Sequence, residues 1–213
     1  MFGMRVLIAL KEKGIPYEYH EEDLQNKSKL LLEANPIHKQ VPMLIHNGKP
    51  ICESLIIVQY IDEAWPSPHV SFLPNEPYDR AVARFWADYV DKKMYDAGIR
   101  IIRNPQGEQR EQGKRDFIEV LETLDRALRD TYGGGPFFGG ECIGLVDIAL
   151  APFLSWFDAY ERMGEFQIWE AAKCPHLLKW AEEVWKVPSV KESLPPPHKV
   201  VEVAEFLRRK FEP

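Results

Sequence analysis

The chain has 213 residues, a formal net charge of −6 and a hydrophobic content of 45%. The acidic balance argues against a nucleic-acid-binding surface, and no apolar run approaches the roughly 20 residues that a membrane-spanning helix needs. Nothing at the N-terminus resembles a signal peptide, because the apolar region after Arg5 ends at Lys11. We therefore expect a protein of one large or two small domains with neither a membrane nor a nucleic-acid partner.

The cysteines and histidines show no metal-binding spacing. Cys52, Cys142 and Cys174 are scattered and odd in number, which favours free thiols in a reducing compartment. The six histidines are equally dispersed and form no ligand cluster. These observations predict a cytoplasmic protein without a metal site.

The beginning of the chain alternates short helices with extended segments. Apolar residues recur at helical spacing over 3–13, and Gly14 provides a stop signal. Residues 17–22 alternate as a strand does. A short helix is predicted over 29–33, opened by Ser28 and closed by the Asn-Pro pair at 35–36.

A hairpin that runs into a helix follows at residues 43–62. Residues 43–45 form an apolar strand, Asn47 and Gly48 form the turn, and residues 49–52 return. Ser54 stands where a helix N-cap belongs, before the apolar run 55–62. This is the stretch of the chain with the strongest local structure signals.

The same stretch carries the first chemical hypothesis. Pro42 cannot donate to a sheet ladder, so it belongs at an edge or a strand start, where the backbone of Val41 can pair with an extended peptide. Glu53 and Ser54 lie beside the free amides of a helix N-terminus, which favours a bound carboxylate, while Glu53 itself can meet an ammonium group. A ligand with an α-amino and an α-carboxylate group fits this set. The alternative is an ordinary hairpin with an ordinary capped helix, and a cis Val41–Pro42 bond is left open.

The remainder of the chain reads as helical. A segment with three prolines in eleven residues, after Trp65, marks a linker. The sequence thus divides into a first domain at 1–65, a linker at 66–77 and a helical domain at 78–213. Asp147 is predicted to cap a helix by reaching back to the amide of Gly144, as a folding element and not a site. Helices are predicted over residues 78–103, 107–129, 148–160, 175–187 and 200–210.

These motifs together resemble the plant tau-class glutathione transferases. The resemblance rests on Val-Pro followed by a strand, Asn-Gly, a second strand and the run Glu-Ser-Leu-Ile-Ile at 53–57. Further similar blocks extend it over essentially the whole chain, at residues 2–6, 22–28, 35–39, 84–93, 139–140 and 144–149.

The resemblance implies an α+β fold, with a thioredoxin-like N-terminal domain followed by an all-α C-terminal domain. The family's first strand is missing from this sequence. The family also has a Ser-Pro-Phe-Gly-Met-Arg run whose serine stabilises the glutathione thiolate. Met1 takes the place of the proline in that run, so the serine would precede the chain and we assign no catalytic residue.

By resemblance, the co-substrate is glutathione and the binding residues lie in the first domain. The backbone of Val41 would pair with the cysteinyl unit, and Glu53 and Ser54 would hold the γ-glutamyl end. Lys27 and Lys39 would meet the glycine carboxylate, although a surface lysine is often simply solvated. Arg5 is interpreted as a structural or rim charge.

The second substrate in this family is an electrophilic, hydrophobic small molecule held mainly by the helical domain. Tyr95 and Trp156 are the preferred candidates, because each combines an apolar face with a polar group. Aromatic residues at helical spacing are commonly core residues, so each candidate has that alternative. The full set of candidates is Tyr95, Ile99, Ile102, Trp156 and Phe206.

Two functions remain open at this point. The first is a glutathione transferase that conjugates glutathione to electrophiles in detoxification or stress. The second is a catalytically weak or inactive ligand-binding protein of the same fold, which the absence of the serine would suggest. The family further implies a homodimer, for which Trp86 and Tyr89 on the long helix are candidate interface residues, with a place in the core as the favoured alternative for Trp86.

Overall fold

The computed structural model describes residues 1–133 and 135–211; residue 134 and residues 212–213, which fall in the predicted helical domain, lie outside the described residues. The first part contains α1 (Phe2–Glu12), α2 (Lys29–Ala34), β1 (Met43–His46), β2 (Lys49–Cys52) and α3 (Ser54–Ala64). The second part contains α4 (Pro77–Tyr89), the π-helical segment η1 (Val90–Met94), α5 (Tyr95–Arg103), α6 (Glu108–Asp130), α7 (Leu145–Leu154), α8 (Phe157–Gly164), α9 (Ile168–Ala171), α10 (Pro175–Val184), α11 (Pro188–Lys191) and α12 (Pro197–Phe211).

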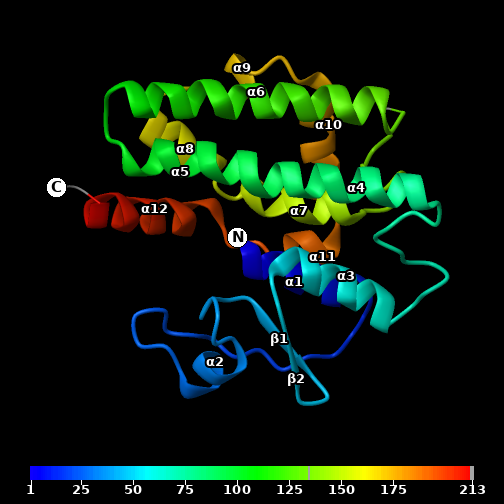
Figure 1. Ribbon diagram of the computed structural model, residues 1–213. Coiled ribbons are helices and arrows are strands. Elements are labelled where there is room, and N and C mark those ends of the chain that lie inside the picture. The colour runs from blue at the N-terminus through cyan, green and yellow to red at the C-terminus, as the bar shows by residue number, and fades with distance from the viewer. Residues whose placement is uncertain (134, 212–213) are drawn as a thin grey trace.

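The two parts meet along α1, which is apolar on most of its surface. Ile8 and Ala9 are fully buried, and α1 packs on α3, α7 and α11. Figure 1 shows α1 and α3 lying between the small sheet and the helical layers. The helix ends as predicted at Gly14, whose φ of 62° suits glycine. The first domain is therefore attached to the second through a buried helix.

The hairpin is confirmed at its predicted position. β1 and β2 pair antiparallel, with Met43 opposite Cys52 and His46 opposite Lys49. Asn47 and Gly48 both have positive φ, 51° and 74°, as the type I′ turn requires. The Val41–Pro42 peptide bond, which the sequence left open, is cis.

The predicted strand at residues 17–22 is wrong. These residues form no regular element, and the sheet of the described residues has only β1 and β2. A strand is stable only when its backbone groups pair with a neighbouring strand. The alternation of polar and apolar residues is therefore not enough to form a strand here. Tyr19, in this segment, remains 64% exposed.

The long helix predicted over 78–103 is confirmed as a continuous run of α4, η1 and α5. Its middle contains a π-helical segment, in which Val90 and Met94 are both fully buried. Such segments insert an extra residue into a helix and often occur at functional sites. Asp91 belongs to this segment and pairs with a side chain of the first domain, as described below.

One predicted helix, 148–160, is wrong as a single element. The chain bends between α7 and α8 at Ser155 and Trp156. Pro152 lies inside α7 and removes a backbone donor, and the Ser155 hydroxyl donates to the Pro152 carbonyl at 2.8 Å. The helix predicted over 175–187 is likewise shorter and ends at Val184. A separate short helix, α11, begins at Pro188. The sequence also missed α9.

The linker is held in place by side chains of the first domain. The Lys13 ammonium pairs with the Asp62 carboxylate at 2.7 Å and also donates to the carbonyls of Trp65 and Val70. Asp62 in turn accepts from the backbone amide of Phe72. The buried hydrophobic core is continuous across both parts. The domain boundaries at 1–65, 66–77 and 78–213 therefore stay a prediction.

Among the described residues, no helix is both long enough and apolar enough to cross a membrane.

Candidate functional site

The end of the hairpin brings together three of the predicted binding residues. Val41 is 41% exposed and precedes the cis proline. Glu53 and Ser54 follow β2 directly, at the start of α3. The predicted N-cap at Ser54 is wrong by one residue: Glu53 is the N-cap and Ser54 is the first helical residue. Glu53 caps through its backbone only, with a φ of 71° that is uncommon for a residue other than glycine.

Ser54 is held by Arg5, a residue for which the sequence predicted only a structural or rim role. The Arg5 guanidinium is completely buried. Its Nη1 donates to the Ser54 hydroxyl oxygen at 3.1 Å and also pairs with Asp91 of the π-helical segment. Its Nε donates to the Ala149 carbonyl at 3.1 Å. One arginine thus joins α1, α3, η1 and α7.

This arrangement sets the direction in which Ser54 can donate. A hydroxyl has one donor and two acceptor positions. Because the Ser54 oxygen accepts from Arg5, its own proton remains available to a further acceptor. Burial lowers the pKa of Arg5, whereas the nearby Asp91 carboxylate raises it. An arginine stays protonated in proteins, so a positive charge lies directly behind Ser54.

The two predicted lysines lie on segments that are tied down by other side chains. Lys27 precedes Ser28, whose hydroxyl donates to Glu22 at 2.8 Å. Lys39 follows His38, and Asn35 holds this segment by donating to the Gln40 carbonyl and accepting from the His38 amide. Among the described residues, neither lysine ammonium has an ion-pair partner, so both remain available to a ligand.

The segment that carries Lys39 lies beside the hairpin site. His38 Nε2 is 3.8 Å from a carboxylate oxygen of Glu53, which places this segment next to the start of α3. The structure provides no comparable contact for Lys27. The roles of Lys27, Lys39, Val41, Glu53 and Ser54 in binding stay predictions.

Of the residues predicted to hold a hydrophobic substrate, Tyr95 contacts the first domain. Its ring contacts that of Phe2, with 5.4 Å between centroids, where α1 begins. Ile99 follows one turn later on α5 and is half-buried. Ile102 is 1% exposed and is therefore a core residue, which excludes it as a substrate contact in this conformation.

Trp156 and Phe206 lie on other elements of the same helical part. Trp156, at the bend between α7 and α8, is half-buried and lies near the ring of Tyr160 at 6.1 Å. Phe206 on α12 is 49% exposed. The helix α12 packs on α5 and α8, so these candidates belong to neighbouring elements. A shared role in substrate binding stays a prediction.

Sequence reasoning missed Arg208, which fixes α12 in place. Its guanidinium donates to the carbonyls of Ile101 and Ile102 on α5 and of Met163 on α8, each at 3.0 Å. These carbonyls lie at or near helix C-termini, where a cation is favourable. The only available signal was a basic residue in the last turn of a predicted helix, which is common and unspecific.

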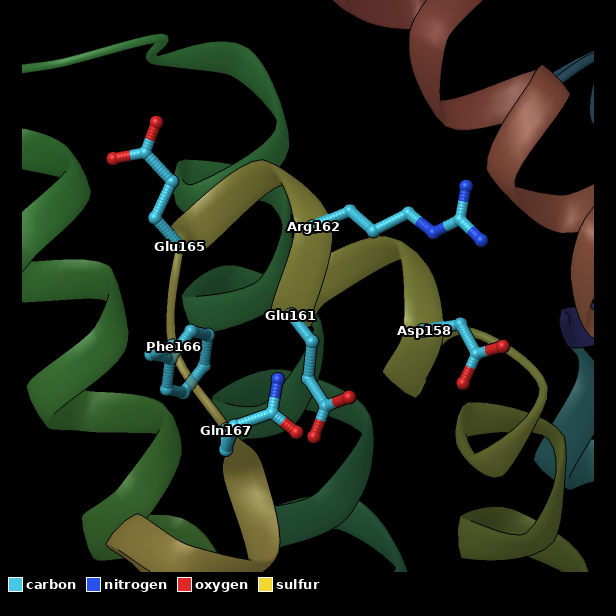
Figure 2. A pocket seen from close by; sticks show the side chains of 6 residues that line it. All are labelled: Asp158, Glu161, Arg162, Glu165, Phe166 and Gln167. Carbon is cyan, nitrogen blue, oxygen red and sulfur yellow. The ribbon is translucent and has the colours of Figure 1, made fainter.

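A surface hollow of about 490 Å³ lies far along the chain from the predicted binding residues. It is lined by Asp158, Glu161, Arg162, Glu165, Phe166 and Gln167. Figure 2 shows that Arg162 and Glu165 point away from each other and that the charged groups do not converge. The Glu161 carboxylate already accepts a hydrogen bond from the backbone amide of Ile168 at 2.8 Å. This hollow therefore offers no catalytic arrangement.

The part of the chain that the structure describes contains no group of three or more histidines, cysteines or carboxylates placed to hold a metal ion. The three cysteines are free, with Cys142 exposed, Cys52 half-buried and Cys174 buried. Burial raises the pKa of Cys174 to about 12, which keeps this thiol protonated and unreactive.

Comparison with known proteins decides the family. The N-terminal domain of the glutathione S-transferases matches residues 1–63, and their C-terminal domain matches residues 107–183. The probable glutathione S-transferase parC of Nicotiana tabacum is 56% identical over 99% of this chain and 92% of its own length. Glutathione S-transferase U19 of Arabidopsis thaliana is 53% identical over 100% of this chain and 94% of its own. The chain belongs to the tau-class glutathione S-transferases.

Solved tau-class structures share the fold. Rice GST1, solved in complex with glutathione, superimposes with a TM-score of 0.91 at 44% identity, covering 100% of this chain and 93% of the rice chain. The tau-class transferase of mango superimposes with a TM-score of 0.90 at 46% identity, covering 97% and 93%. The predicted fold class, a thioredoxin-like domain followed by a helical domain, is thus confirmed for this transferase.

Proposed function

We propose that this tau-class transferase conjugates glutathione to electrophilic, hydrophobic small molecules. The observation that carries the proposal is the hairpin site, where Val41 precedes β1, Glu53 and Ser54 follow its partner strand β2, and Arg5 orients the serine hydroxyl. The family membership of the chain supports the same chemistry, since its relatives are glutathione S-transferases. The alternative of a ligand-binding protein without turnover has no observation in its favour. A conjugation assay with a model electrophile tests the choice.

The proposed binding mode follows from the groups on glutathione. Its γ-glutamyl end carries a carboxylate that accepts from the Ser54 hydroxyl and the amides at the start of α3, and an ammonium that pairs with Glu53. The Val41 backbone pairs with the cysteinyl unit, and Lys27 and Lys39 attract the glycine carboxylate. The electrophile would lie against Tyr95, Ile99, Trp156 and Phe206 of the helical part.

A first test is the Ser54→Ala variant. We expect its affinity for glutathione to fall by about 1.5–3 kcal/mol, the value typical of a hydrogen bond to a charged group. Because Glu53 and not Ser54 caps α3, the substitution should leave the helix start intact. Calorimetric titration with glutathione measures the effect, with Gln59→Ala on the same helix as the control. Equal affinity in a folded Ser54→Ala variant would contradict the site.

A second test concerns assembly. We propose a homodimer in the cytoplasm, where the free cysteines are stable. On α4, Phe85 is 60% exposed, whereas Trp86 and Tyr89 are half-buried against the core; Phe85 therefore offers more surface to a partner than the two residues predicted first. With Ile56 on α3, 55% exposed, it presents apolar area of the kind found in interfaces.

Light scattering at micromolar concentration is expected to give the mass of two 24.7 kDa chains. Phe85→Glu is expected to shift the mass toward that of one chain, because a carboxylate is poorly tolerated in an interface core. Glu205→Gln, on α12, serves as a surface control. A monomeric mass for the unmodified protein would refute the dimer.

A further inference from the structure

A cavity of about 670 Å³ lies apart from the glutathione and electrophile residues. It is bounded by the linker at 71–75, one side of α4 between Tyr78 and Trp86, residues 131–132 and 138–140 after α6, and residues 144–146 at the start of α7. None of the residues predicted to bind either substrate lines it. The volume falls within the range of small-molecule sites in proteins, so the cavity has room for a ligand of its own.

Five aromatic side chains from the described ranges contribute to the lining of the cavity. Phe72 and Phe138 are 2% and 4% exposed and form part of its floor. Tyr132 stacks edge-on against Phe138 with 5.2 Å between ring centroids. Trp86 and Tyr78 contribute further aromatic side chains from α4. Aromatic faces carry negative electrostatic potential, which attracts organic cations as well as apolar groups.

The charge of the lining has one sign. Among the described residues that line the cavity, Asp79, exposed in the first turn of α4, is the only charged side chain, and none is a lysine, arginine or histidine. The guanidinium of the neighbouring Arg80 donates to the carbonyls of Pro74 and Asn75, two linker residues that belong to the lining. Burial is the main cause that raises the pKa of Tyr132, with Asp147 and Asp79 adding to it. The phenol therefore stays neutral, and the Asp79 carboxylate is the charged group of the lining that a cationic ligand would meet.

We propose that this cavity binds a small organic cation, a protonated amine on an apolar ring body. The ring would pack among Phe72, Trp86 and Phe138, and the ammonium would face Asp79 at the mouth. Glutathione and its conjugates carry carboxylates, which this lining repels and which the lysines of the hairpin site attract. The two sites therefore differ in the sign of the charge on the ligand that each accepts.

Three probes of equal ring size test the proposal by calorimetric titration of the whole protein: 2-phenylethylamine, 2-phenylethanol and 3-phenylpropanoate. We expect the amine to bind about fivefold more tightly than the alcohol, because the carboxylate of Asp79 is solvent-exposed and its contribution is modest. The anion should bind more weakly than both. Saturating glutathione should leave the affinity for the amine unchanged.

Two variants locate the site. Asp79→Asn should weaken binding of the amine about fivefold, to the level of the alcohol, whereas Glu76→Gln removes the same charge at the N-cap of the same helix but outside the lining and should change nothing. Val82→Trp should fill the cavity and weaken binding of amine and alcohol more than tenfold. If Val82→Trp does not fold by circular dichroism, the comparison of Asp79→Asn with Glu76→Gln decides alone.

Equal affinities for the amine and the anion would overturn the proposal, as would an Asp79→Asn variant that binds the amine as tightly as Glu76→Gln does. Displacement of the amine by glutathione would place it in the hairpin site and would equally refute a separate cavity site. None of these outcomes depends on catalysis, so the proposed transferase function can hold or fail independently.

Discussion

Replacing Asp147 with alanine is expected to lower the free energy of unfolding by about 3–5 kcal/mol. The Asp147 carboxylate is fully buried and accepts four hydrogen bonds. Three come from the amides of Phe138, Gly139 and Gly144 at 2.8–2.9 Å, and the fourth comes from the Trp180 indole at 2.7 Å. Alanine would leave four donors without this partner, and three of them, the amides of Phe138 and Gly144 and the Trp180 indole, are buried. Urea denaturation followed by circular dichroism measures the loss.

Asp147→Asn gives a second, pH-dependent readout. Burial raises the pKa of Asp147 from 3.8 to about 6 in spite of its hydrogen bonds. The folded protein therefore holds this proton more tightly than the unfolded chain does, and the contribution of Asp147 to stability falls as the pH rises from about 4 to 6. Asparagine does not titrate. The stability advantage of the unmodified protein over Asp147→Asn should thus shrink by an amount on the order of 3 kcal/mol across this window. A difference that is constant with pH would contradict the assignment.

The second large effect is expected for Arg5→Met. Methionine fills much of the space of the arginine stem but leaves the Ala149 carbonyl and the Asp91 carboxylate without their donor. Breaking a buried ion pair costs about 3–5 kcal/mol. Because the side chain of Asp91 is 36% exposed, water can replace part of that interaction, so we expect a loss of about 2–4 kcal/mol. Affinity for glutathione should fall as well, because the Ser54 hydroxyl loses its orienting donor.

A double-mutant cycle separates the ion pair from packing. Arg5→Met combined with Asp91→Leu leaves no unpaired carboxylate, so it should be more stable than Arg5→Met alone. Its affinity for glutathione should remain low, since Ser54 still lacks Arg5. Lys92→Met changes a neighbouring charge whose partner is the exposed Asp88 and should leave stability within about 0.5 kcal/mol. An Arg5→Met variant with unchanged stability and affinity would refute this role.

The features that the sequence predicted correctly are specified locally. Asn47 and Gly48 select a tight turn, Ser28 caps α2 through its hydroxyl, and Asp147 lies three residues from the amide it accepts. Each of these signals involves residues within a few positions of one another. The predictions therefore needed no knowledge of the tertiary structure.

Two of the features that the sequence missed depend on distant partners, whereas the third, the bend between α7 and α8, is local. Arg5 contacts Asp91 and Ala149, which lie 86 and 144 residues away in the sequence. The residues around Arg5 in α1 do not distinguish it from an ordinary helix arginine. The segment 17–22 alternates like a strand, but pairing depends on a neighbour that alternation cannot provide. The bend between α7 and α8 arises where Ser155 bonds to Pro152, and the apolar pattern continues through it.

The fixed linker has a consequence for how the protein unfolds. Phe72 donates its amide to Asp62 of α3 and accepts from the amide of Leu145 at the start of α7. A single linker residue therefore bonds to both halves, and the core beneath it is shared. The two halves should behave as one cooperative unit, with a single melting transition and slow hydrogen exchange at the Phe72 amide. We therefore expect the segment around Phe72 to open only when the core itself unfolds.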